Sequence, residues 1–190
     1  MKINSLRLQQ HCEAMSLIGK IGETGTCRPA HTELEKQGFE IAASWMQEAG
    51  MKTRIDNFGN LIGRLEGKNP NLPCLMMGSH LDSQPYGGRF DGVAGVLCAI
   101  EVVTTLTENG IQPERPIEVI SFADEEGWRF NKGLFGSRGI LGKLEEGELQ
   151  RADKDGITRE QALKDFGCDV TKFIASEYKE GSIFCFLELH

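Results

Sequence analysis

The chain has 190 residues, of which 39% are hydrophobic and 26% are charged, so it has the composition of a folded protein of about one domain and not of a disordered tail. Acidic residues outnumber basic residues 28 to 21, which gives a net charge of −7 and argues against nucleic acid or an anionic membrane as a partner. The six cysteines form no C-x-x-C pair, and no apolar segment is typical of a secretory signal or a membrane span, so we expect reduced thiols and a cytoplasmic protein.

The first half of the chain begins with helical patterns. Apolar side chains at loose helical spacing predict a helix over residues 6–18. Thr32 is of a type that caps helices, and the acidic residues just after it favour a second helix that ends at Gly50. Two short strands, 51–56 and 60–67, are predicted to follow, joined by a turn.

The middle of the chain has the pattern of a parallel strand–helix–strand unit. Residues 73–80 form a nearly continuous apolar run, which is typical of a strand buried on both faces. A long apolar helix is predicted over 91–108, and a strand rich in β-branched residues over 116–123. A unit of this length places its two strands parallel in one sheet, so the sequence predicts an α/β fold.

The last third of the chain is more polar. Residues 131–142 are predicted to form a loop, and the polar segment 145–169 to contain one modest helix at 158–166. A final strand is predicted over residues 182–190.

Potential ligands follow the predicted strands, which is where α/β folds place their sites. His80 and Asp82 end the first buried strand, and residues two apart in a strand point the same way. A histidine that binds a metal commonly donates its second ring proton to a carboxylate, a role that Asp82 suits. Taken alone, this pair is more readily explained as a surface histidine beside an acid.

Two further acidic positions also have simple structural explanations. Asp91 lies among glycines at the start of the long helix, where an aspartate ordinarily serves as the cap. Asp124, Glu125 and Glu126 follow the second strand, and three adjacent acids repel one another unless they are solvated or neutralised. A divalent cation would neutralise them, with one carboxylate as ligand and its neighbour as general base on a metal-bound water.

The positions of these clusters favour one common explanation. Parallel strands bring His80 and Asp124 to the same edge of the sheet, and Asp91 begins the helix that joins the two strands. His190 ends another strand, with Glu188 two residues before it. A single metal site explains this convergence better than separate structural roles, and two imidazoles with carboxylates suit zinc, manganese, nickel or cobalt.

Three segments resemble a known family: GSHLDSQPYGGRFDGVAGVLCAIEV, RPIEVISFADEEGWRFNKGLFGSRGILG and FLELH. The resemblance is to the metal-dependent N-carbamoyl-amino-acid hydrolases and allantoate amidohydrolases, the hydantoinase/carbamoylase family of the co-catalytic zinc aminoacylase–dipeptidase superfamily. It extends from about Ile41 to His190. It implies a three-layer α/β/α zinc-hydrolase fold that hydrolyses a linear amide or ureido bond in an N-carbamoyl amino acid, ureidopropionate or allantoate.

The resemblance also implies roles for individual residues. Those that match the family's metal ligands are His80, Asp91, Glu126 and His190. Asp91 would bridge two divalent ions, with zinc as the first choice and manganese, nickel or cobalt as alternatives. Glu125 matches the general base, which takes a proton from the water and returns it to the leaving nitrogen, and Asp82 matches the carboxylate that supports the site.

Family members continue beyond the final ELH motif, through a dimerisation and lid domain and back into the catalytic domain. Residues 1–190 therefore resemble the N-terminal portion of that domain, incomplete at its C-terminal side, and another histidine ligand lies in the part that is missing. The resemblance implies a homodimer and a small-molecule substrate for full-length relatives. A peptidase or aminoacylase with the same chemistry is an alternative, although the short Gly-Gly interval between His80 and Asp91 and the final histidine favour the carbamoyl branch. An inactive remnant is a further alternative.

Overall fold

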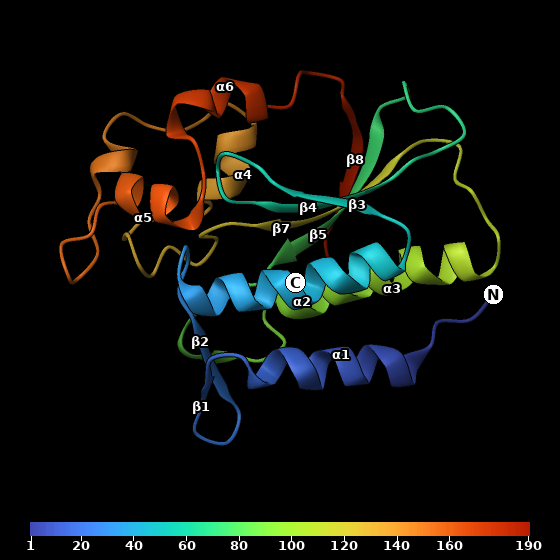
Figure 1. Ribbon diagram of the computed structural model, residues 1–190, viewed down its shortest axis with the longest axis horizontal. Helices are drawn as coiled ribbons and strands as arrows, with labels where there is room; N and C mark the ends of the chain where they lie inside the picture. The colour runs from blue at the N-terminus through green and yellow to red at the C-terminus, as the bar shows by residue number, and fades with distance from the viewer.

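The computed structural model describes residues 1–190, which form two sheets with helices on both sides of the larger one (Figure 1). The strands of the larger sheet are, in spatial order, β3 (Lys52–Ile55), β4 (Leu61–Leu65), β7 (Ile117–Phe122), β5 (Cys74–His80) and β8 (Ile183–Leu187). The helices on one side are α1 (Ser5–Leu17), α2 (Glu33–Glu48) and α3 (Val93–Glu108). Those on the other side are α4 (Phe135–Ile140), α5 (Arg159–Phe166) and α6 (Phe173–Ser176). The predicted α/β/α layering is confirmed.

The predicted parallel unit is the centre of the larger sheet. Strands β5 and β7 pair in parallel, with His80 opposite Phe122 at their carboxyl ends, and α3 joins them. Strand β8 adds to the other side of β5, also in parallel. The strands β3 and β4, which the sequence predicts correctly, pair antiparallel with each other, and β4 pairs antiparallel with β7.

Two apolar cores explain why the central strands are mostly hydrophobic. On one face, Met77 and Val119 are buried in the core formed with α2 and α3. On the other face, Met76 and Ile120 are buried in a second core that includes Phe135 of α4. Because successive strand residues point to opposite faces, a sheet covered on both sides favours nearly continuous apolar runs in its central strands.

The helix starts agree with the sequence in two cases and differ in one. Thr32 and Thr158 cap α2 and α5, each accepting a hydrogen bond from the third backbone N–H along, at 3.4 and 3.2 Å. The expectation that Asp91 begins the long helix is wrong, because α3 begins at Val93 with Gly92 as the cap residue. The carboxylate of Asp91 therefore makes no cap hydrogen bond and stays available at the edge of the sheet.

The structure contains elements that the sequence does not predict. Residues 131–142, expected to be a loop, include the helix α4, and two single-turn helices lie at Glu148–Gln150 and Val170–Lys172. A small second sheet consists of β1 (Lys20–Ile21), β2 (Gly25–Arg28) and β6 (Ser83–Gly88), with β6 directly following His80 and Asp82. All six cysteines are free, and no helix is long and apolar enough to cross a membrane.

Candidate metal centre

His80 lies at the carboxyl end of β5 with its side chain only 1% exposed. Its Nδ1 lies 3.0 Å from the backbone carbonyl oxygen of Asp82 and 3.5 Å from that residue's Oδ1. Because a carbonyl oxygen only accepts, this contact places a hydrogen on Nδ1. It leaves Nε2 facing the other candidate ligands at this edge of the sheet, which we call the rim. Such an arrangement is the usual way of orienting a histidine that binds a metal.

Three side chains surround Nε2 of His80. The Nε2 of His190 and Oε2 of Glu125 both lie 3.4 Å away, and Oδ1 of Asp91 lies 3.9 Å away. His190 Nε2 and Asp91 Oδ1 are 3.3 Å apart. Ligand atoms of His80, Glu125 and His190 fall within 4.8 Å of one another, which is close enough for one metal ion to contact them together.

The start of α3 brings Asp91 to this edge because residue 92 is a glycine. Gly92 has a φ of +63°, and a Cβ there would lie 2.3 Å from Cδ2 of the His80 ring. Any larger residue would have to move the imidazole or the helix, so the glycine allows the two ligands to approach.

The Asp82 carboxylate holds the backbone of the acidic turn, residues 124–126. Its Oδ1 and Oδ2 each accept a backbone N–H at 3.2 Å, from Glu125 and Glu126 respectively. The third acid, Asp124, is turned away from the rim, and its Oδ2 accepts a hydrogen bond from Nη2 of Arg159 at 2.6 Å. The crowding that the sequence suggests is therefore divided, with two acids at the rim and one paired inside the protein.

The charges at the rim shift the pKa values of its residues. Burial alone would lower the pKa of His80, but its hydrogen bond to Asp82 and the charges of Asp82 and Glu125 raise that pKa to about 9. Burial is the first cause that raises the pKa of both Glu125 and Glu126, and the negative charge of Asp82 adds to it. The metal-free rim therefore holds a proton on His80 that a metal ion would have to displace.

Glu126 and His190 differ from His80 in their surroundings. One carboxylate oxygen of Glu126, Oε1, is buried and has no hydrogen-bond partner in the chain. His190 follows β8, its side chain is 45% exposed, and its Nδ1 lies 3.8 Å from Glu188 Oε1. A second ion position between Asp91 and Glu126 stays a prediction, as do the individual roles of the six residues.

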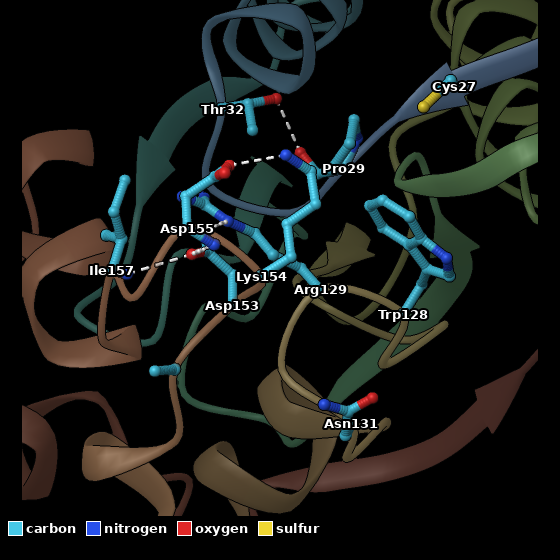
Figure 2. A pocket seen from close by; sticks show the side chains of 11 residues that line it. Cys27, Pro29, Thr32, Trp128, Arg129, Asn131, Asp153, Lys154, Asp155 and Ile157 are labelled. Atoms are coloured by element: carbon cyan, nitrogen blue, oxygen red, sulfur yellow. Dashed lines mark hydrogen bonds and ion pairs between the residues drawn. The ribbon is translucent and has the colours of Figure 1, made fainter.

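Two cavities differ in their relation to this rim. One of about 400 Å³ lies beside Glu125 and His190, and its walls include the apolar side chains of Phe122, Leu134 and Phe186. A larger one of about 600 Å³ lies beside the turn of residues 153–157 and contains none of the predicted site residues (Figure 2). Only the first cavity can place a bound molecule against the candidate ligands.

The sequence pattern gives no sign of Arg159. This residue contacts Asp124 across 35 positions in the chain and lies in a segment expected only to hold a modest helix. A buried arginine is recognised from its partners, which the fold brings together.

Comparisons with known proteins show what the chain is similar to. A family model described as "Peptidase family M28" matches residues 60–155. The chain is 44% identical over 190 residues to an N-carbamoyl-L-amino-acid amidohydrolase of Pseudomonas sp. (strain NS671), covering 99% of this chain and 46% of that protein. It is 34% identical to an allantoate deiminase of Arabidopsis thaliana, covering 91% of this chain and 35% of that protein.

A solved structure, a hydantoinase/carbamoylase family amidase from Burkholderia ambifaria, matches with a TM-score of 0.84 and 40% identity. The match covers 88% of this chain and 41% of that one. The chain thus spans less than half of the length of the relatives it matches.

Proposed function

The chain belongs to peptidase family M28, and on that premise we propose that it forms the metal-binding part of an amidohydrolase. The substrate would be a linear C–N bond of an N-carbamoyl amino acid, a ureidopropionate or allantoate, the class to which the names of its relatives point. The observation that carries the proposal is the convergence of two histidines with two acids: ligand atoms of His80, Glu125 and His190 lie within 4.8 Å of one another. Oδ1 of Asp91 lies 3.9 Å from His80 Nε2 and 3.3 Å from His190 Nε2.

The donor set fits divalent ions of the zinc class. Two imidazole nitrogens with carboxylate oxygens suit zinc, manganese, nickel or cobalt, and the buried Oε1 of Glu126 is an acceptor that lacks a partner. We assign His80, Asp91, Glu126 and His190 as the residues that would hold two such ions. When bound, such ions polarise a carbonyl oxygen and lower the pKa of water.

We assign proton transfer to Glu125. Its Oε2 faces His80 Nε2 at 3.4 Å, and burial raises its pKa, which suits a group that first accepts a proton from water and then returns it to the leaving nitrogen. Asp82 keeps this carboxylate in place through the Glu125 backbone N–H and orients His80 through its own carbonyl oxygen. The cavity beside Glu125 and His190 supplies an apolar wall for the rest of the substrate.

A peptidase is the second candidate, favoured by the description of the matching family model. Both candidates use the same rim, and they differ in the group attached to the attacked carbon. We further propose that residues 1–190 are the N-terminal portion of a catalytic domain that is completed by a longer chain, and that the protein works in the cytoplasm, where six free cysteines stay reduced.

A chimera tests the proposal. Residues 1–190 would replace the segment of the Pseudomonas amidohydrolase to which they align, so that the relative supplies every remaining part. We expect the metal-loaded chimera to release ammonia from N-carbamoyl-L-amino acids or allantoate and to leave dipeptides intact. Cleavage of dipeptides alone would favour the peptidase, and a folded, metal-loaded chimera inactive on every substrate would contradict both.

A further inference from the structure

A network of alternating charges lies behind the acidic turn, which consists of residues 124–126. The side chains of Arg159, Asp124 and Glu148 are 0%, 1% and 3% exposed. Arg159 lies between the two acids, with Nη2 2.6 Å from Asp124 Oδ2 and Nη1 2.5 Å from Glu148 Oε2. Arg138 pairs with the other oxygen of Glu148. None of these charged side chains is one of the candidate metal ligands.

Asp124, the acid of this network that belongs to the acidic turn, has an unfavourable backbone conformation. Asp124 has a φ of +49°, in the left-handed region that residues other than glycine adopt at a cost in free energy. Its Oδ1 has no partner within the chain, so Arg159 is the residue that anchors this carboxylate. Because Asp124 directly precedes Glu125 and Glu126, the same backbone turn sets where their side chains begin.

Arg159 also holds the returning part of the same loop. Its Nη2 donates to the carbonyl oxygen of Lys132 at 2.9 Å, and its guanidinium lies 4.4 Å from the centre of the Phe135 ring. Next to these residues, the Leu134 N–H donates to the Glu125 carbonyl oxygen at 3.0 Å. One guanidinium therefore contacts both ends of the loop that carries Glu125.

We propose that Arg159 is a positioning residue that acts through Asp124 to hold Glu125 and Glu126 in place for metal binding and proton transfer. The inference rests on the proposed function, which gives these two glutamates their roles. Burying a guanidinium between two carboxylates seldom stabilises a protein more than apolar packing does, so stability alone is a poor explanation for these contacts, and the position of the turn is a better one. Removing a group that hydrogen-bonds directly to a metal ligand typically changes metal affinity about ten- to a hundred-fold. Arg159 acts through Asp124, one residue further from the ligands, so we expect the lower end of that range.

The test uses the chimera described above and two measurements on each variant: Co²⁺ affinity by titration calorimetry, and residue-resolved amide hydrogen exchange without metal. Arg159→Met is expected to weaken Co²⁺ binding by about tenfold. It is also expected to raise exchange at the Glu125 and Glu126 amides, which donate to Asp82, by about tenfold or more relative to the amides of α3. Arg159→Lys keeps the charge but not the forked contacts, so its Co²⁺ affinity and exchange rates should lie between those of the wild type and Arg159→Met. It replaces the methionine variant if that variant does not fold.

Arg7→Met is the matched control. Arg7 also joins two carboxylates, those of Glu101 and Glu108, but it does so between α1 and α3. This variant should lose stability and keep both the Co²⁺ affinity and the exchange rates of the acidic turn.

A double variant tests the route through Asp124. Asn tolerates a left-handed φ, so Asp124→Asn removes the charge without forcing the backbone to change. In that background Arg159→Met should change the Co²⁺ affinity by less than about twofold. An undiminished loss there, or unchanged exchange at Glu125 and Glu126 in a folded Arg159→Met chimera, would overturn the inference. A wild-type chimera that folds and binds no Co²⁺ would refute the proposed function instead, and the exchange rates would still decide the role of Arg159.

Discussion

Glu125 and Glu126 are adjacent and both donate a backbone N–H to Asp82, yet we assign them different roles. Glu125→Gln should abolish turnover in the chimera while leaving metal content nearly intact, because an amide cannot take a proton. Glu126→Gln should lower the metal content instead, because an amide oxygen is a weaker ligand than a carboxylate. Metal analysis of the purified variants, together with an ammonia assay, separates the two, and equal metal loss in both would show that the roles are misassigned.

The proton on His80 makes metal binding depend on pH. In the metal-free chain its pKa is raised to about 9, so His80 is protonated at pH 7 and an ion must displace that proton. Deprotonation favours binding, and the apparent affinity should therefore rise about tenfold per pH unit from pH 6.5 and level off above pH 9. Calorimetric titration with Mn²⁺ across this range measures the slope. An affinity that does not change with pH would mean that His80 is neutral or is not a ligand.

At the residue scale, sequence reasoning depends on local order. His80, Asp91 and Glu125 could be placed at one edge because each adjoins an element of a single strand–helix–strand unit. The separation of Asp124 from its two acidic neighbours could not be predicted, because it depends on Arg159, which packs against Asp124 only after α5 has docked.

At the scale of elements, the junction between β6 and α3 decides how close Asp91 comes to His80. Gly92→Ala should both strain the left-handed backbone and push a Cβ into the His80 ring. We expect it to lower the stability of the protein and to weaken Co²⁺ binding by about tenfold or more. Gly110→Ala is the control, because Gly110 follows the other end of α3 at a φ of +67° with nothing within 4 Å of the added Cβ. Its cost should be the strain alone, about 1–2 kcal/mol in thermal or denaturant unfolding, with no change in affinity. Equal affinities in both variants would contradict a steric role for Gly92.

The elements that the sequence missed have weak local signals. Helix α4 contains glycines, which lower intrinsic helix propensity, and it forms because Phe135 and Ile140 bury against the sheet and Gly139 fits against the Phe58 ring. The small sheet depends on β6 pairing with β2, more than fifty residues earlier in the chain. By contrast, α3 and β7 were predictable because long apolar periodicity and β-branched runs are local properties.

At the scale of the whole molecule, we expect the 190-residue chain to show negligible amidase activity on its own. His190 is half-exposed, and Phe184, Leu187 and Leu189 in and just after β8 are 55–62% exposed, so the rim is open and the sheet has an apolar edge that invites self-association. Misplacement of catalytic groups by about 1 Å can cost roughly a hundredfold in rate. Assays of N-carbamoyl amino acids with added zinc or manganese, combined with size-exclusion chromatography, measure this. Turnover near that of a full-length relative from a monodisperse monomer would contradict the expectation.

The metal site itself is the central claim, and anomalous diffraction at the zinc edge from crystals of the zinc-loaded chain tests it most directly. We predict a zinc ion within about 2.0–2.2 Å of His80 Nε2, a nitrogen of His190 and an oxygen of Asp91, and at higher zinc concentration a second ion between Asp91 and Glu126. Zinc bound elsewhere on the molecule, with His80 and Asp91 both free of it, would contradict the account.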